Sequence, residues 1–404
     1  MKLTSQLGLF LALALMITGC GSQSESSKQQ EGNLPEQVVV QLPEQEQPEK
    51  EAEQKDQEQQ QAEDTKPNEQ AGAAAGNNTP PAKSDKPDAS KGSNASKPAN
   101  GGSTAPQQPS PGKKQPAGNL QMLVTHNFGA VSEFNRSVSY YGGESVMDVM
   151  RQHLEIETAY GGSFVNSING VKSGYTDKSI FTRKKRDWFY YVNGVVSSVG
   201  ADAYAAKNSA SVWWDYHDWS GSGSNTPAVV ASYPHPFTSG YEGARPGTVI
   251  YYSDGHADDA DRLASALRGQ GAQGVSTASY RNQTLIENTT NVILLGLWSE
   301  LEDHSSVQDV MSSPTRTGIY AKVKDGAVQM LDYTGDESGK AGQAMVVATG
   351  TGNGDTTPTW LLIGVNDAAL DEAVNTMTSG GSKLRGKVGI VLSGSTAVGI
   401  PVAP

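Results

Sequence analysis

Cysteine is nearly absent from this chain of 404 residues, which contains only Cys20. An internal disulfide is therefore excluded, and any folded part must rely on core packing. Basic residues are also in short supply, because 31 Lys and Arg are set against 43 Asp and Glu, giving a formal net charge of −12. Nucleic acid is therefore not expected as a partner. The apolar run at residues 7–17 is too short to span a membrane.

The first twenty residues have the build of a secretory signal. Lys2 precedes the apolar run, and Thr18 and Gly19 stand directly before Cys20. This order resembles the lipobox of bacterial lipoproteins. The resemblance implies that residues 1–19 are a lipoprotein signal peptide, that lipid is attached to Cys20, and that the protein is held at the extracellular face of the bacterial cell membrane. A plain secreted protein with a stray cysteine is the alternative.

Residues 20–118 contain hardly any apolar side chains, apart from the patch at residues 38–40. Gln, Glu, Lys, Pro, Ser, Asn and Gly follow one another there without a period. Such a segment buries too little apolar surface to offset the entropy that ordering would cost. We expect a long, disordered, lipid-anchored tether that lifts the rest of the chain off the membrane.

Order is expected to begin at residue 119. The pattern predicts a strand at 120–128, a helix at 144–154 with one apolar face, a strand at 164–168, and two aromatic strands within 187–219. One helix and several strands in about a hundred residues indicate an α+β domain over residues 119–220. Our preferred form is β-grasp-like, with one helix packed on a curled sheet.

A second domain is predicted over residues 228–404, after a Gly/Ser-rich linker at 220–227. Strands and helices alternate there, which is typical of an α/β domain. This alternation of strands and helices weakly resembles the α/β domains of some S-layer and cell-wall proteins. Helices are expected at residues 257–267 and 367–377, and an apolar strand is expected at residues 248–252. Three further apolar runs, at residues 291–296, 344–349 and 360–364, are typical of buried parallel strands.

Aromatic residues are scarce at 7%, yet four of the six tryptophans lie in residues 187–219. Trp213 and Trp214 are neighbours in a predicted strand, so their side chains point to opposite faces of the sheet. We therefore expect one of them to be exposed and available to a ligand. The other interpretation is that most of these rings form the core of a small domain.

Two short motifs surround the aromatic strands: GSFVNSING at residues 162–170, and VSSVGADAY at 196–204, with Trp188 between them. This order resembles the C-terminal domain of the transcobalamin and intrinsic factor family, and bacterial lipoproteins that share the module. The resemblance covers about a quarter of the chain. It implies a small domain that covers one side of a corrinoid, although the large helical domain of that family has no counterpart in this sequence.

The resemblance and the residue types together predict a ligand site with apolar area and a few polar groups. Its predicted members are Val165, Asn166, Ser167, Trp188, Tyr190, Val196, Ser197, Ser198, Trp213, Trp214 and Tyr216. The ligand is cobalamin or a related corrinoid, and no catalytic cofactor is expected. The implied function is capture and delivery to a membrane importer of the energy-coupling-factor type, helped by the tether.

Several alternatives stay open at this stage. A structural or adhesive surface protein that binds wall polymer or protein would also use aromatic strands. The basic run at residues 183–186 could attract the phosphate of a nucleotide tail or an anionic wall polymer, or simply form a solvated hairpin. His217 could coordinate cobalt or merely occupy a strand end.

No GxSxG elbow, HExxH motif or Cys/His pair occurs in the sequence, so hydrolase chemistry has no support and we do not expect an enzyme. An extracellular enzyme in the second domain, with Asp254, His256 and Asp258 in one cleft, is the third alternative. The acidic segment at residues 253–261 lies between a strand and a helix, and we expect Ser253 or Asp254 to cap that helix rather than hold a metal. The glycine-rich residues 350–354 are followed by a strand and not by a helix, so they do not fit a dinucleotide site.

Overall fold

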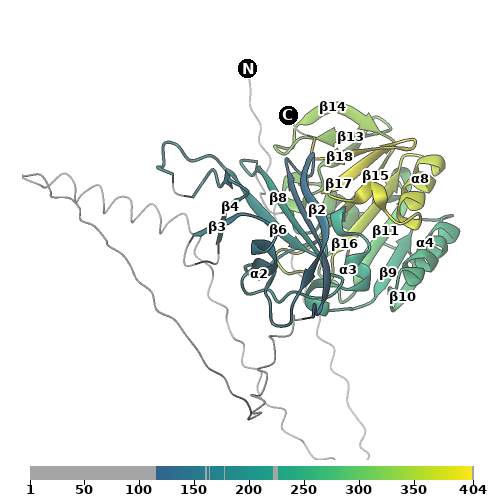
Figure 1. Ribbon diagram of the computed structural model, residues 1–404. Helices are drawn as coiled ribbons and strands as arrows, with labels where there is room; N and C mark the ends of the chain where they lie inside the picture. Colours follow the sequence, from purple (N-terminus) through teal and green to yellow (C-terminus); the bar gives the residue numbers. More distant parts are fainter. Residues whose placement is uncertain (1–114, 160–161, 163, 177, 222–225, 403–404) are drawn as a thin grey trace, which may run out of the picture. The chain divides into compact units, whose positions relative to one another are not determined.

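The computed structural model describes residues 115–402, except 160–161, 163, 177 and 222–225 (Figure 1). The predicted signal peptide, Cys20 and nearly all of the predicted tether lie outside the described residues. Within the described ranges, none of the helices has the length and apolar character that crossing a membrane requires.

The β-grasp lobe, as we call residues 115–221, is built on a five-stranded sheet in the order β2-β1-β8-β6-β7. Its two central strands, β1 and β8, run parallel, and every other neighbouring pair is antiparallel. The predicted α+β class and β-grasp-like arrangement are confirmed. The strands are β1 Gly118–His126, β2 Val131–Tyr140, β6 Arg186–Val192, β7 Val195–Val196 and β8 Ser211–Asp218, with a smaller sheet of β3 Ile156–Ala159, β4 Phe164–Ile168 and β5 Val171–Lys172.

Helix α2, Val146–Arg151, is shorter than the segment predicted from its apolar spacing. Ser145 begins it with a capping box: Asp148 N donates to Ser145 Oγ at 3.1 Å, and Ser145 N donates to Asp148 Oδ2 at 2.9 Å. The buried side chains of α2 pack with those of β1 in a core on one face of the sheet. This core is called the helix-side core below.

Strand β2 was not predicted from the sequence. Its residues VSEFNRSVSY are mostly exposed, and the strand pairs only with β1 at the edge of the sheet. An edge strand with one solvated side needs little apolar sequence, so the pattern carries almost no strand signal.

The α/β lobe, residues 226–402, contains a seven-stranded sheet in the order β10-β9-β11-β16-β15-β17-β18. The first four strands are parallel, and helices α4 Ala257–Gly269 and α8 Asp367–Thr378 pack on it (Figure 1). The predicted α/β character is confirmed. The strands are β9 Thr248–Tyr252, β10 Val275–Ser279, β11 Asn291–Leu297, β15 Ala344–Thr349, β16 Thr359–Gly364, β17 Gly389–Ser393 and β18 Thr396–Ile400.

The direction of β15 was predicted wrongly, because it runs antiparallel to β16. All of its residues are buried, and a strand buried on both faces reads as an apolar run whichever way it points. The remaining elements are η2 Val230–Ser232, α3 His235–Thr238, η3 Tyr241–Gly243, α5 Trp298–Leu301, α6 Ser305–Met311, α7 Pro314–Thr317 and η4 Ser382–Leu384, with a small sheet of β12 Ala321–Lys324, β13 Ala327–Leu331 and β14 Glu337–Gly342.

The start of α4 also differs from the prediction that Ser253 or Asp254 caps it. His256 occupies the N-cap position and makes no side-chain capping bond. Asp254 instead pairs with Arg281, Oδ1 to Nη1 at 3.0 Å, and Ser253 is buried. The first-turn acids Asp258 and Asp259 do suit the helix dipole, as expected.

The two lobes share one hydrophobic core. Leu123, Phe128, Tyr191 and Trp213 of the β-grasp lobe join buried residues of the α/β lobe in a single cluster, called the shared core below. The β-grasp sheet is therefore covered on both faces, by the helix-side core and by the shared core. The change from the β-grasp lobe to the α/β lobe lies near residues 220–228, and the division into two domains stays a prediction.

Candidate functional site

Trp213 and Trp214 are both buried, with 1% and 4% of their surface exposed. Trp213 stacks on Tyr191 in the shared core, with ring centroids 5.1 Å apart, and its Nε1 donates to Thr125 Oγ1 at 2.7 Å. Trp214 stacks on Tyr190 at 4.6 Å in the helix-side core. The prediction that one of the pair is exposed is wrong, because the α/β lobe covers the face that a free domain would leave open.

The structure does gather four of the predicted aromatic residues along β6 and β8. Trp188 pairs with Tyr216 across the strands, and Tyr190 pairs with Trp214, so the four rings lie on one face. The Trp188 and Tyr216 centroids are 5.2 Å apart. Trp188 and Tyr190 are buried with Val165, whereas Tyr216 is only partly buried and donates its hydroxyl to Lys172 O at 3.0 Å.

The predicted polar members lie elsewhere. Asn166 and Ser167 are buried on β4, where Asn166 Oδ1 accepts a bond from Thr176 Oγ1 at 2.5 Å. The hydroxyls of Ser197 and Ser198 each lie 3.1 Å from the Tyr241 hydroxyl of the α/β lobe.

Val196 belongs to the shared core, and its carbonyl accepts a bond from Gly354 N at 2.8 Å. The segment at residues 196–198 therefore joins the two lobes. Of the predicted site residues, only Ser198 is exposed, with Ser197 and Tyr216 partly buried.

A surface cluster that the sequence did not predict as a unit lies at the starting end of β6. Three partly buried rings each carry a cation on one face, and we call this group the ring–cation platform. Arg183 Cζ lies 4.9 Å from the Tyr175 centroid, Lys185 Nζ 5.1 Å from Trp219, and Arg186 Cζ 5.3 Å from Tyr216. The Tyr175 and Trp219 rings are themselves 5.3 Å apart.

Backbone hydrogen bonds hold the platform together. Gly174 N donates to Arg186 O, and Lys184 N donates to Gly174 O, both at 2.8 Å, which closes the loop that carries Tyr175. Trp219 N donates to Lys185 O at 2.8 Å and brings the end of β8 alongside. The sequence shows the basic run and Trp219, but nothing in it indicates that Tyr175 lies between them.

Asp187 adds a titratable group beside the platform. Burial raises its pKa to about 6, and hydrogen bonds from Trp188 N and Ser173 Oγ oppose the rise only in part. Burial likewise raises the pKa of the Tyr216 phenol, with the nearby Arg186 acting against it. Around neutral pH, Asp187 is therefore mostly ionised, and it loses its charge in mild acid.

Replacing Asp187 with asparagine should stabilise the protein at pH 7. The folded pKa is raised from 3.8 to about 6, so the native state binds more protons than the unfolded state between these values. The free energy of unfolding therefore falls as pH rises through this window in the wild type. We expect Asp187→Asn to be more stable by about 1 kcal/mol at pH 7, after allowance for partial exposure, and equal near pH 4. Urea unfolding at several pH values tests this, and two parallel pH curves would contradict it.

His217 lies near the end of β8 and is buried, with 2% of its surface exposed. Its Nδ1 lies 2.7 Å from Asp215 Oδ2, and its ring stacks between Phe128 at 4.2 Å and Phe189 at 4.0 Å. These surroundings tie His217 into the core between the lobes: Asp215 engages its Nδ1, and burial keeps the ring away from a cobalt ion in a surface-bound ligand.

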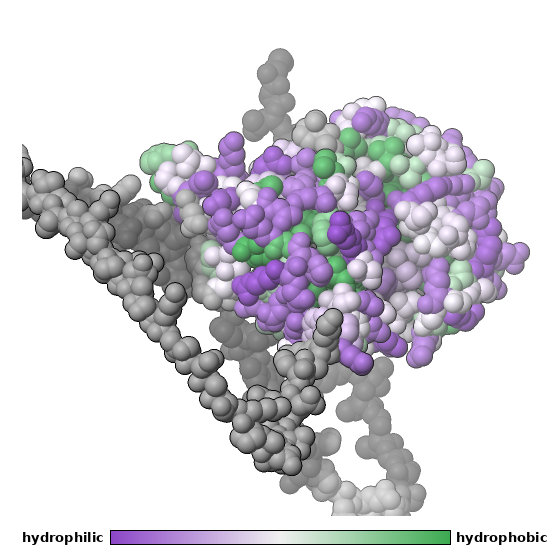
Figure 2. Space-filling model, in the orientation of Figure 1, coloured by the Kyte–Doolittle hydropathy of each residue, from purple (hydrophilic) through white to green (hydrophobic). Residues whose placement is uncertain are grey.

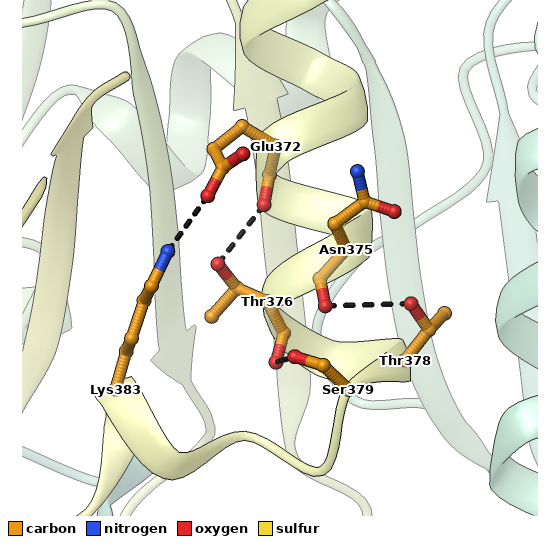
Figure 3. A pocket seen from close by; sticks show the side chains of 6 residues that line it. All are labelled: Glu372, Asn375, Thr376, Thr378, Ser379 and Lys383. Carbon is orange, nitrogen blue, oxygen red and sulfur yellow. Dashed lines mark hydrogen bonds and ion pairs between the residues drawn. The ribbon is translucent and has the colours of Figure 1, made fainter. Parts of the chain in front are cut away.

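The α/β lobe carries a hollow of about 300 Å³ at the end of α8 (Figure 3). Its polar side chains mostly bond to one another or to α8: Lys383 Nζ pairs with Glu372 Oε1 at 2.7 Å, and Thr376 Oγ1 donates to Glu372 O at 2.9 Å. Over the described part of the chain, no group of three or more His, Cys, Asp or Glu side chains is arranged to hold a metal ion.

In a comparison with known protein families, residues 143–218 match a family described as a domain of unknown function, DUF4430. Haptocorrin in complex with Cbi is similar at 16% identity and a TM-score of 0.20, over 24% of this chain and 24% of haptocorrin. A protein from Ruminococcus gnavus ATCC 29149, suggested to bind metal, is similar at 10% identity and a TM-score of 0.19, over 25% of this chain and 97% of its own. At these scores neither likeness carries an argument about the ligand. A search of curated proteins found no match.

Proposed function

We propose that the β-grasp lobe binds a corrinoid, and that the ring–cation platform is its contact surface. The observation that carries the proposal is the presence of three partly exposed rings, each with a cation over it, near the starting end of β6. Two of these rings, Tyr175 and Trp219, adjoin each other. A corrinoid combines a broad, partly apolar disc with a nucleotide tail, so it needs apolar area and a group that receives a phosphate. The rings can supply the first and the cations the second.

The sequence motifs at residues 162–170 and 196–204 support the same ligand through their resemblance to the transcobalamin and intrinsic factor family. The predicted lipid anchor at Cys20 and the tether would keep the bound corrinoid near a membrane importer of the energy-coupling-factor type and raise its local concentration there. The protein would thus act by binding and delivery rather than by catalysis.

Titration of residues 21–404 with cyanocobalamin, followed by equilibrium dialysis, tests the proposal. We expect Arg183→Ala and Trp219→Ala each to weaken binding about tenfold, which corresponds to about 1.4 kcal/mol. Arg136→Ala is the matched control, because Arg136 also lies over a ring, 5.4 Å from the Phe134 centroid, but outside the platform. Equal losses in all three variants, or no binding at about 100 μM ligand, would refute the corrinoid site.

The adhesive alternative rests on the same cations, since an anionic wall polymer could also pair with them. Isolated wall material should then bind the protein, and an excess of cyanocobalamin should fail to displace it. Displacement by cyanocobalamin would instead favour the corrinoid.

A further inference from the structure

Two exposed apolar side chains stand next to each other at the tip of the loop between β5 and β6. Phe181 is 85% exposed and Ile180 is 49% exposed. Hydrophilic residues cover most of the face shown in Figure 2, and hydrophobic ones appear there as smaller patches. An adjacent pair of bulky apolar residues in contact with water is therefore unusual for this surface and calls for an apolar partner.

The backbone around the pair is closed into a turn. Thr182 N donates to Ser179 O at 2.9 Å, and Arg183 N donates to the same oxygen at 3.1 Å. Arg183 Nε donates to Lys178 O at 3.1 Å. Because these polar groups are paired within the loop, the tip can enter an apolar environment at a smaller desolvation cost.

Positive charge surrounds the tip, although the whole chain carries −12. Lys178, Lys184 and Lys185 are exposed, and Arg183 follows the apolar pair closely. No acidic residue occurs in the sequence from 178 to 186. A negatively charged surface is therefore the complement of this loop, while most of the chain would be repelled by it.

We propose that residues 178–185, the loop tip, insert shallowly into the surface of an anionic lipid bilayer. Ile180 and Phe181 would enter the boundary between headgroups and acyl chains, while the lysines pair with anionic headgroups. A protein partner fits less well, because two side chains fall far short of the roughly 1,200 Å² that a stable protein interface buries. A bilayer, in contrast, adapts to a narrow tip. Arg183 and Lys185 belong to both the loop tip and the platform. The inference is nevertheless tested apart from the corrinoid proposal, because Lys178, Ile180, Phe181 and Lys184 are outside the platform.

Vesicle co-sedimentation with residues 21–404, which lack Cys20, the predicted site of lipid attachment, and the predicted signal peptide, tests the inference. We expect binding to vesicles of equal parts phosphatidylglycerol and phosphatidylcholine, and at least tenfold weaker binding to phosphatidylcholine alone. The double variant Ile180→Ser/Phe181→Ser should lower the binding to anionic vesicles about tenfold, and Lys178→Glu/Lys184→Glu should do the same. High salt should weaken the wild-type interaction.

Val131→Ser is the matched control, because Val131 is 53% exposed on β2 and does not belong to the loop tip. It should bind as the wild type does. Equal binding to both vesicle types, unchanged binding by Ile180→Ser/Phe181→Ser, or binding to isolated wall polymer but not to vesicles would overturn the inference. Thermal unfolding of each variant checks that the fold is intact, which is expected because the substituted side chains face water.

Discussion

Replacing Asp215 with asparagine should destabilise the folded unit by about 3–5 kcal/mol. The Asp215 side chain is fully buried and accepts hydrogen bonds from four donors. Its oxygens lie 2.8 Å from Phe128 N, 3.0 Å from Gly129 N and 2.7 Å from His217 Nδ1, and Thr125 Oγ1 also donates to it. An amide removes the charge and turns an NH2 group toward donors, so at least one of them loses its acceptor.

Urea unfolding measures this loss, and Asp218→Asn on the same strand provides the control. Asp218 is only partly buried and bonds locally, to Ser220 N and Oγ at 2.8 and 2.5 Å. We expect the control to change stability by less than about 1 kcal/mol. Similar losses in the free energy of unfolding for the two variants would contradict a large contribution from the buried hydrogen bonds of Asp215.

The pH dependence of the same residue follows from its pKa. Burial by itself would raise the pKa of Asp215, but the bonds from His217, Thr125 and Gly129 outweigh it and lower the pKa below 3.8. A lowered folded pKa gives stability that is present above 3.8 and is lost as pH falls through the folded value. The difference in the free energy of unfolding between the wild type and Asp215→Asn should therefore become smaller below about pH 4.

Trp213→Ala is expected to cost about 3–5 kcal/mol as well. The indole is 1% exposed, fills the shared core against Tyr191, and donates to Thr125 Oγ1, so its removal leaves a large cavity and deletes one buried hydrogen bond. Trp219→Ala is the matched control, because its ring is partly exposed on the platform, and about 1 kcal/mol is expected. Chemical unfolding followed by far-UV circular dichroism compares them. A larger loss for Trp219→Ala would contradict the burial of Trp213.

Much of the fold could be predicted because its signals are local. Strands β9, β11 and β16 are continuous apolar runs, and α4 and α8 have a clear helical spacing. Strand β2 could not be predicted, since it is polar and gains its conformation from pairing with β1. The direction of β15 could not be predicted either, because a strand buried on both faces has the same apolar sequence whether it is parallel or antiparallel.

The candidate site was predicted less well than the fold. Strand alternation correctly places Trp213 and Trp214 on opposite faces, but a sequence does not reveal that a second lobe covers one of those faces. Tyr175 was missed because a closed loop, rather than a periodic pattern, carries it to Trp219. Both failures concern contacts between segments that are distant in the chain.

The shared core also means that the β-grasp sheet cannot be fully packed until the C-terminal part of the chain is present. Lys387 Nζ donates to Gly129 O at 2.9 Å, although the two residues are 258 positions apart in the sequence. Leu123 Cδ2 also lies so close to Gly386 that a side chain at Gly386 would contact it at 3.1 Å. A ribosome releases residues 123–129 long before their partners are made. Until residues 386–387 follow, we expect one apolar face of the β-grasp sheet to be uncovered, which favours aggregation of the incomplete chain.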